Sequence, residues 1–302
     1  MMRTHRRLSL VTVLISAFFL LAGVSALHAQ SSRVITVVAA ENFYGSIVQQ
    51  IGGDRVSVTS VMSDPNVDPH EYESSVEDAK AIADADLVIE NGGGYDDWMD
   101  KLLSASPKAS RVVLKGFDMA VHKLPDNEHV WYNLDNAQAI ALAVSRSLQK
   151  LLPQSAAVIA KNERAFQDSL GPIRQKMAQI SARYSGTPIG LTETIFLYQA
   201  LPMGLKVLTP FAFQKAIAEG NDPPADAAVE TENQIKTRQV RILVYNEQTV
   251  SPITTKAQAD AKAGGIPIVG VTETMPQGET YQTWMLRQLE ELRMALEKAG
   301  SR

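Results

Sequence analysis

The chain has 302 residues, of which 45% are hydrophobic and 21% charged, and it contains no cysteine. The absence of cysteine excludes a disulfide framework, a thiolate metal site and a cysteine nucleophile. The formal net charge is −4, and residues 1–29 contribute arginines but no acids, so the remainder is more acidic still. This charge argues against binding to nucleic acid or to an anionic lipid surface.

Residues 1–29 have the pattern of a signal peptide for export. Three arginines, Arg3, Arg6 and Arg7, precede an apolar run over residues 8–21, and Ala26 and Ala29 both suit a cleavage site. The run is short for a bilayer span, which favours cleaved export over a membrane anchor. Because no cysteine is available for lipidation, we expect a periplasmic or secreted protein that is not a lipoprotein.

In the first half of the chain, short apolar runs alternate with segments of helical spacing. We predict strands at 34–39, 56–62, 86–89 and 111–114, and helices at 41–51, 75–83 and 96–103. Ser75 supports the second of these helices, because its side chain can cap the backbone N–H of Asp78. Buried strands separated by helices predict a parallel sheet that is covered on both faces.

The middle of the chain carries the longest helical stretch. One helix is predicted over 136–152, and a second follows Pro153, with apolar residues from Ile159 to Tyr184 forming a single stripe. Gly171-Pro172 interrupts this stripe and predicts a kink, because proline lacks a backbone donor and clashes with the preceding turn.

The second half repeats the alternation of strands and helices. Strands are predicted at 188–191, 205–208, 242–245 and 266–271, and helices at 194–201, 211–218, 253–263 and 281–299. The predicted fold is therefore α/β, with two Rossmann-like lobes, each a mostly parallel sheet flanked by helices. The predicted boundaries are 1–29 for the signal peptide, 30–152 for the N-terminal lobe, 153–185 for the linker helix and 186–302 for the C-terminal lobe.

Residues with metal-binding side chains follow several of the predicted strands. Asp68-Pro69-His70 follows the second strand, Glu193 follows the strand at 188–191, and Glu273 follows the last strand. Ligands of doubly wound sheets bind outside the carboxyl ends of the strands, so these residues share the ligand-binding edge. With His129, which lies in an aromatic-rich stretch before a helix, they provide two imidazoles and two carboxylates. Such a set predicts a site for a divalent metal.

Each of these residues also has an explanation that involves no metal. His70 can bond a neighbouring carboxylate, and His129 can be a buried core histidine. Glu193 and Glu273 lie near predicted helix N-termini, where the helix dipole stabilises an acid whatever its role. We expect His122 at the surface in a polar loop. Glu247, which follows the strand at 242–245, is a further acid that can support the ligands.

Several motifs together resemble the metal-binding solute receptors of ATP-driven zinc and manganese importers, the cluster A-I solute-binding proteins of ABC transporters. The resemblance extends over nearly all of the chain after the signal peptide. Its marks are Ala40-Glu41-Asn42, Asp68-Pro69-His70, His129-Val130-Trp131, Tyr198 with Gly204-Leu205, and Thr280-Tyr281.

The resemblance implies a monomeric receptor that holds one metal ion between its lobes and delivers it to a membrane permease. It implies His70, His129, Glu193 and Glu273 as the ligands. Glu193 falls where zinc receptors commonly have a third histidine and manganese receptors a glutamate, and Glu273 falls where an aspartate is usual. The histidine-rich loop of many zinc receptors is absent. The carboxylates favour Mn²⁺ over Zn²⁺ as cargo, and Fe²⁺ is also compatible.

Two other functions are compatible with a metal site. The first is a secreted metal-dependent hydrolase, and the second is a metal-binding adhesin on the same fold. The sequence has no His-Glu-x-x-His helix, no nucleophile elbow and no glycine-rich phosphate loop, so we expect a protein that is not an enzyme.

Overall fold

The structure is a computed structural model that describes residues 33–64, 67 and 72–300. Val34–Arg302 form one compact unit. The predicted signal peptide and Asp68-Pro69-His70 lie outside the described residues, so the predictions made for them stay predictions.

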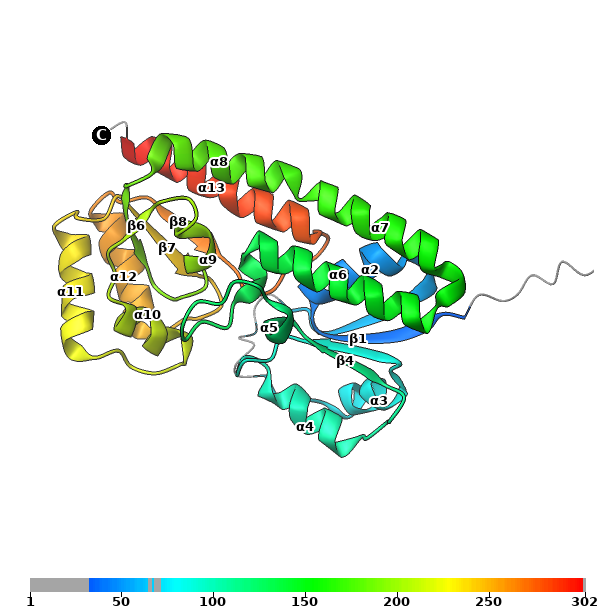
Figure 1. The fold of residues 1–302 in the computed structure, drawn as a ribbon. Helices are drawn as coiled ribbons and strands as arrows, with labels where there is room; N and C mark the ends of the chain where they lie inside the picture. Colours follow the sequence, from blue (N-terminus) through cyan, green and yellow to red (C-terminus); the bar gives the residue numbers. More distant parts are fainter. Residues whose placement is uncertain (1–32, 65–66, 68–71, 301–302) are drawn as a thin grey trace, which may run out of the picture. The chain divides into compact units, whose positions relative to one another are not determined.

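The first sheet has four parallel strands in the order β2-β1-β3-β4 (Figure 1). The strands are β1 (Ile35–Glu41), β2 (Val56–Met62), β3 (Leu87–Glu90) and β4 (Val112–Lys115). Val37 of β1 pairs with Val58 on one side and with Leu87 on the other. Nearly every residue of β1 and β3 is buried, which is why these strands read as continuous apolar runs.

Two layers of helices cover the two faces of this sheet (Figure 1). Val37 and Ala39 of β1 pack with one helical layer, whereas Val38 and Ala40 pack with the other, as the alternation of side chains along a strand requires. The first layer contains α2 (Asn42–Gly52) and α6 (Leu134–Leu151), and the second contains α3 (Val76–Asp84) and α4 (Asp97–Ala105). The shorter elements are η1 (Gly53–Arg55), α5 (Gly116–Met119), η3 (Val130–Tyr132) and η4 (Pro153–Ser155).

The predicted cap at Ser75 is confirmed. The Ser75 hydroxyl accepts the backbone N–H of Asp78 at 3.2 Å, and the Asp78 carboxylate accepts the backbone N–H of Ser75 at 2.7 Å. This reciprocal pair satisfies two of the donors that a helix N-terminus leaves without intrahelical partners. It fixes the start of α3 at Val76.

The second sheet repeats the topology of the first, with parallel strands in the order β6-β5-β7-β8. Its strands are β5 (Pro188–Leu191), β6 (Lys206–Val207), β7 (Ile242–Asn246) and β8 (Ile268–Val271). Its helices are α9 (Leu197–Ala200), α10 (Phe211–Ala218), α11 (Ala225–Lys236), α12 (Pro252–Ala263) and α13 (Tyr281–Gly300). The predicted α/β class with two Rossmann-like sheets is confirmed.

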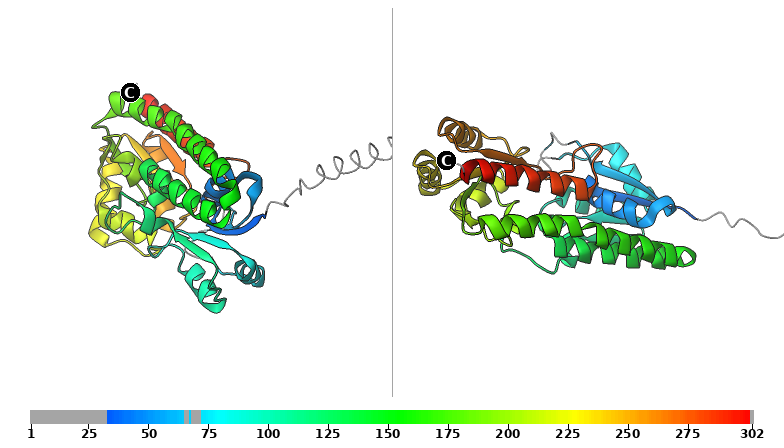
Figure 2. Two further views of the ribbon diagram at one scale, coloured as in Figure 1. Left: turned by 45° about the vertical axis from the view of Figure 1, so that its right-hand side comes forward. Right: turned by 90° about the horizontal axis from the view of Figure 1, so that it is seen from above.

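The predicted linker helix is divided into α7 (Ala156–Ser169) and α8 (Gly171–Tyr184). The division falls at Leu170, directly before Gly171-Pro172, because Pro172 cannot donate the backbone hydrogen bond that a continuous helix needs. α7 packs against α2 and α6, whereas α8 packs against α13 (Figure 1, Figure 2). The same segment therefore contacts helices that belong to both sheets. The boundaries at 29, 152 and 185 stay predictions.

One prediction for the second half was wrong, and one helix was missed. The helix expected over 194–201 is reduced to the single turn α9, because residues 193–200 are buried on all sides and form tight turns, such as Leu197 N–H to Thr194 O at 3.0 Å. Helix α11 was not predicted, since its sequence is mostly polar and has few apolar residues at helical spacing. Most other element ends differ from prediction by one or two residues, the usual uncertainty at helix and strand ends.

Burial of Glu90 at the end of β3 predicts a pH-dependent stability. Glu90 is 1% exposed, and burial raises its pKa from 4.5 to about 7 although Lys115 Nζ lies 2.9 Å from its carboxylate. The folded state therefore binds the Glu90 proton more tightly than the unfolded state does. Its contribution is favourable below pH 4.5 and is lost as the pH rises towards 7, by up to about 3 kcal/mol.

Glu90→Gln is expected to flatten the decline in unfolding free energy between pH 5 and pH 8, as measured by urea denaturation. Lys115 keeps a partner in this variant, because its Nζ also lies 2.7 Å from Asp100. Glu77→Gln, at an exposed position on α3, is the matched control and should keep the wild-type slope. A Glu90→Gln protein with the wild-type pH dependence would contradict this assignment.

Candidate metal centre

Three residues of the predicted site lie on loops that follow different elements. His129 directly precedes η3, while Glu193 and Glu273 each lie two residues beyond the end of a strand, β5 and β8 respectively. Their exposed fractions are 0%, 2% and 1%. Glu193 and Glu273 both lie at the edge of the second sheet where its strands end. Doubly wound sheets bind their ligands at this edge, so two buried acids lie where a ligand site is expected.

The three side chains converge on one point. His129 Nε2 lies 3.2 Å from Glu193 Oε1 and 4.0 Å from Glu273 Oε2. One ligand atom from each residue lies within 4.8 Å of the others, a spacing that can hold a metal ion. The structure thus brings together three of the four residues predicted from the sequence, and the fourth, His70, lies outside the described residues.

Asn127 sets the tautomer of His129. Its side-chain amide donates to the carbonyl of Thr194 at 2.8 Å, so its Oδ1 is the atom that accepts the backbone N–H of His129 at 3.1 Å. The same Oδ1 lies 3.0 Å from His129 Nδ1. Because an amide oxygen only accepts hydrogen bonds, Nδ1 carries the proton. The neutral imidazole then presents the lone pair of Nε2 towards the two carboxylates, as a metal ligand does.

Each carboxylate is oriented by hydrogen-bond donors. Glu193 Oε2 accepts the backbone N–H of Ile195 at 3.2 Å. Glu273 Oε2 accepts the hydroxyl of Tyr95 at 2.8 Å, and its Oε1 accepts the side-chain amide of Asn246 at 2.5 Å. These bonds orient the acids, so little side-chain freedom is left to lose when an ion binds.

Charge balance favours a divalent cation at this point. Glu193 and Glu273 are both buried, and over residues 33–64, 67 and 72–300 no lysine or arginine side chain is buried. Protonation of His129 supplies only one positive charge, so His129, Glu193 and Glu273 together would still carry a net negative charge. Burying a net charge away from water is costly. A divalent ion bound to a neutral imidazole cancels both carboxylate charges.

Aromatic side chains form the wall behind His129. The rings of Tyr95 and Trp131 meet the imidazole edge-on, with centroids 5.8 Å and 5.2 Å away. Phe43 of α2 stacks on Trp131 at 4.5 Å, which ties this wall to the core. The hydroxyl of Tyr132 donates to the backbone carbonyl of Thr272 at 2.6 Å and so anchors the loop that carries Glu273. The site is rigid and shielded from water, conditions that strengthen electrostatic binding.

Tyr95 was not predicted from the sequence. It ends a glycine-rich loop after β3 in which Gly92, Gly93 and Gly94 have φ values of 71°, 68° and 93°, a region that only glycine adopts without strain. The Asp96 carboxylate holds this loop through the backbone N–H groups of Asn91 and Gly92, at 2.6 and 2.7 Å. Burial, together with the nearby Glu273, raises the pKa of Tyr95 well above its usual range, so its hydroxyl stays a donor.

Asn246 and Gln248 were also missed, and Glu247 was considered in their place. Glu247 is exposed, whereas Asn246 and Gln248 on either side are buried, as expected where side chains alternate at the end of β7. The Gln248 side-chain oxygen accepts the backbone N–H of Glu273 at 2.7 Å, and its amide donates to the carbonyl of Val67 at 2.8 Å. Glu247 was predicted to support the ligands, but it is Asn246 and Gln248 that bond to Glu273.

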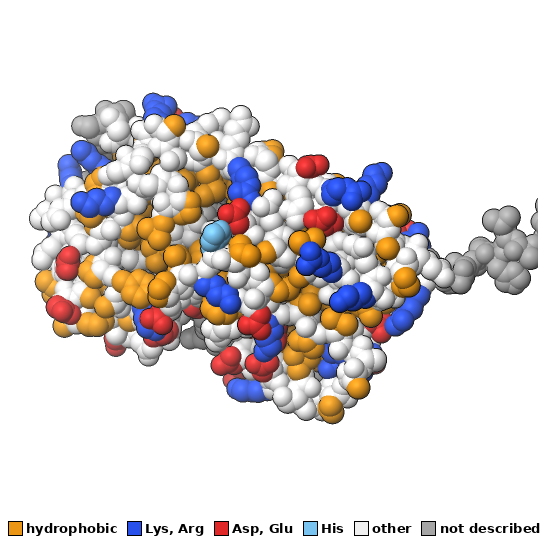
Figure 3. Space-filling view, in the orientation of Figure 1, with side chains coloured by type: hydrophobic (Ala, Val, Ile, Leu, Met, Phe, Trp, Pro, Cys, Tyr) orange, Lys and Arg blue, Asp and Glu red, His pale blue; other side chains and the backbone are white. Residues whose placement is uncertain are grey.

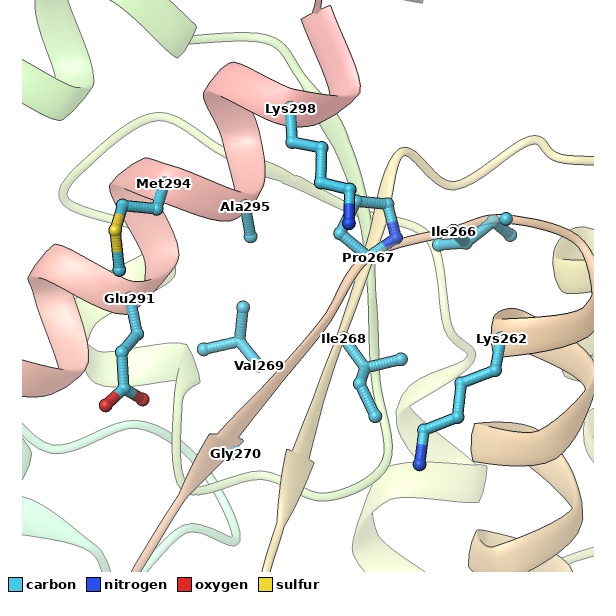
Figure 4. A pocket seen from close by; sticks show the side chains of 11 residues that line it. Lys262, Ile266, Pro267, Ile268, Val269, Gly270, Glu291, Met294, Ala295 and Lys298 are labelled. Atoms are coloured by element: carbon cyan, nitrogen blue, oxygen red, sulfur yellow. The ribbon is translucent and has the colours of Figure 1, made fainter.

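Two surface features lie apart from this cluster. His122 is 60% exposed, with Nε2 3.4 Å from Asp135 Oδ2, and Arg174 binds the same aspartate at 2.6 Å, an arrangement that disfavours a cation. A pocket between β8 and α13 is lined by Lys262, Glu291 and Lys298 and by none of the predicted ligands (Figure 4). On the face in Figure 3, acidic and basic side chains are interspersed, so no acidic field gathers there.

A two-sheet α/β chain whose loops gather a buried imidazole and two buried carboxylates has the features of a metal-binding protein. The chain belongs to the family described as "Zinc-uptake complex component A periplasmic", whose model matches residues 37–295. This match confirms the resemblance to metal-binding solute receptors. The family is one of transport components rather than of enzymes.

Relatives of similar length support the family assignment. The chain is 25% identical over 315 residues to the manganese ABC transporter substrate-binding lipoprotein PsaA of Streptococcus pneumoniae serotype 4, covering 96% of this chain and 98% of the relative. It is 23% identical over 286 residues to the metal ABC transporter substrate-binding lipoprotein ScbA of Streptococcus cristatus, covering 88% and 90%.

Solved structures show the same fold. The periplasmic zinc-binding protein TroA of Treponema pallidum superposes with a TM-score of 0.74 at 19% identity, covering 87% of this chain and 99% of the other. FpvC of Pseudomonas aeruginosa, in a complex with Mn²⁺, superposes with a TM-score of 0.72 at 21% identity, covering 88% and 98%. These likenesses concern the fold.

The names of the relatives correct the expected localisation. PsaA and ScbA are both named lipoproteins, which contradicts the expectation of a protein that is not a lipoprotein. That expectation depended only on the lack of cysteine in this sequence, and a residue count in one sequence does not decide how members of a family are held at a membrane. Among the helices that the structure describes, none is both long enough and apolar enough to cross a bilayer.

Proposed function

We propose that this protein is an extracytoplasmic solute-binding receptor that captures a divalent transition metal and delivers it to an ABC permease. The observation that carries the proposal is the buried cluster of His129, Glu193 and Glu273, whose ligand atoms lie within 4.8 Å of one another. We assign these three residues as metal ligands and His70 as the fourth.

The ligand chemistry fits the metals named for the relatives. TroA is titled a zinc-binding protein, PsaA is named for manganese, and FpvC is described with Mn²⁺ and with Ni²⁺. An imidazole nitrogen and carboxylate oxygens suit each of these ions, and the stability order of divalent ions does not by itself select among them. The metal is cargo in this proposal, and the preference for Mn²⁺ over Zn²⁺, drawn from the two carboxylates, stays a prediction.

The position of the ligands suggests how loading is signalled to the permease. Glu193 and Glu273 extend from the second sheet, whereas the loop carrying Tyr95 and the Val67 carbonyl belongs to the first. His129 belongs to the same half of the chain as the first sheet, so a metal ion bound by His129, Glu193 and Glu273 links the two halves and stabilises a closed arrangement, which the permease can distinguish from the metal-free one. The protein is expected to act as a monomer.

Elemental analysis and titration test this function. Purified protein is expected to retain about one equivalent of divalent metal, and the metal-free form should gain thermal stability on addition of MnCl₂ or ZnCl₂, since a ligand that binds only the folded state stabilises it. Competition between the two ions then ranks them as cargo. Metal content at background, together with an unchanged melting temperature in both salts, would contradict the proposal.

A further inference from the structure

The orientation of the Asn246 amide is fixed by its surroundings. Asn246 is the last residue of β7 and is 2% exposed. Its Oδ1 accepts the backbone N–H of Gln248 at 3.0 Å, and its Nδ2 donates to the hydroxyl of Thr249 at 2.8 Å. Because the oxygen is engaged by a backbone donor, the side that faces Glu273 is the NH₂ group, which donates to Oε1 at 2.5 Å.

The two oxygens of Glu273 therefore have different surroundings. Oε2 lies 4.0 Å from His129 Nε2 and faces the cluster, where it also accepts the hydroxyl of Tyr95. Oε1 is held by Asn246, with the hydroxyl of Thr249 at 3.5 Å. Glu193 has the same division, since its Oε1 lies 3.2 Å from His129 Nε2 and its Oε2 accepts the backbone N–H of Ile195. In each carboxylate, one oxygen lies near His129 Nε2 and the other accepts a donor from outside the three residues.

The number of oxygens that a carboxylate offers sets the coordination number of the metal. Zn²⁺ is stable with four ligands in a tetrahedron, whereas Mn²⁺ favours about six oxygen-rich ligands. A carboxylate that binds through one oxygen adds one ligand, and one that binds through both oxygens adds two. A donor that holds one oxygen of a ligating carboxylate can thus act on metal preference without touching the metal.

We propose that Asn246 is a specificity-determining residue: by holding Oε1 of Glu273 it restricts this ligand to one oxygen and shifts the site from Mn²⁺ towards Zn²⁺. The inference rests on the proposed function, because it requires a metal at the cluster. It makes Asn246 a positioning residue, distinct from Tyr95, whose hydroxyl is bonded to the oxygen that faces the metal.

The test compares Asn246→Ala and Asn246→Leu with Tyr95→Phe in the full chain freed of metal. MnCl₂ and ZnCl₂ are titrated in competition with a chelator, and CoCl₂ is added to read coordination from its visible absorption, which weakens as the coordination number rises. Both Asn246 variants should raise the ratio of Mn²⁺ to Zn²⁺ affinity by about tenfold and weaken the Co²⁺ absorption. Tyr95→Phe should change both affinities alike and keep the ratio within about threefold.

The outcomes separate this inference from the proposed function. If wild-type protein binds neither MnCl₂ nor ZnCl₂, both the proposed function and the inference are overturned. Wild-type protein that binds them, with an unchanged affinity ratio and Co²⁺ spectrum in folded Asn246 variants, overturns the inference alone. If neither Asn246 variant folds, a crystal structure of the zinc-loaded wild type decides, because a metal contacted by both oxygens of Glu273 overturns the inference and contact through Oε2 alone supports it.

Discussion

Replacing His129 by alanine is expected to weaken binding of Mn²⁺ and Zn²⁺ by at least about 100-fold, more than the 10- to 100-fold loss typical of a residue that only supports a ligand. His129 is fully buried and its Nε2 faces both Glu193 and Glu273. Alanine removes that nitrogen and leaves the two carboxylates to hold the ion without it. Competitive titration of the metal-free variant measures the loss.

His122→Ala is the matched control. His122 is 60% exposed and pairs with Asp135 rather than with the cluster, so its removal should leave both affinities within about threefold of wild type. Equal losses in the two variants, or full binding by His129→Ala, would show that the metal is held elsewhere. Circular dichroism of each variant establishes that a loss of binding is not a loss of folding.

Glu193→His is the second change with a large expected effect. It replaces a carboxylate oxygen by an imidazole nitrogen at a position 3.2 Å from His129 Nε2, which moves the site towards the nitrogen-rich ligand sets of zinc proteins. The ratio of Zn²⁺ to Mn²⁺ affinity should rise by at least about tenfold, chiefly through weaker Mn²⁺ binding. The two ions are titrated separately against the same chelator.

The comparison for this variant is Glu219→His, which makes the same substitution at an exposed acid after α10. Its affinity ratio should equal that of the wild type. If Glu193→His also leaves the ratio unchanged, Glu193 does not contact the metal, and its burial beside His129 is a matter of ion pairing alone.

Much of the fold follows from local patterns in the sequence. The buried strands of both sheets appear as short apolar runs, because a parallel strand covered on both faces has no polar side. A kink was predicted at Gly171-Pro172, where the structure divides α7 from α8, because the missing N–H of Pro172 acts within one turn of its own helix. Ser75 marked the start of α3, because its side chain caps a backbone N–H of the first helical turn. Each of these signals operates over a few residues.

The candidate ligands were predicted from their position along the chain. Glu193 and Glu273 each lie two residues past a strand end, and His129 stands beside Trp131 and Tyr132. Parallel strands have their carboxyl ends at one edge of the sheet. Residues that follow these strands in the sequence are therefore predicted to lie near one another. The structure adds that three of them converge.

The supporting residues could not be predicted in this way. Tyr95 reaches Glu273 across 178 positions of sequence, and Asn246 reaches it across 27. These contacts depend on how loops from different strands meet, which no local spacing encodes. The sequence held weak indications of both supporting residues, since Asn246 directly follows a predicted strand and Tyr95 follows three glycines. Helix α11 was missed because its stability comes from packing rather than from a strong apolar stripe.

The central claim is that His129, Glu193 and Glu273 hold a metal ion together, and anomalous diffraction from crystals of manganese- and zinc-loaded protein tests it most directly. We expect a single strong anomalous peak between His129 Nε2, Glu193 Oε1 and Glu273 Oε2, at about 2.0–2.2 Å from each in the zinc form. A peak only elsewhere, such as beside His122 and Asp135, or no peak in crystals grown with either metal, would contradict the account.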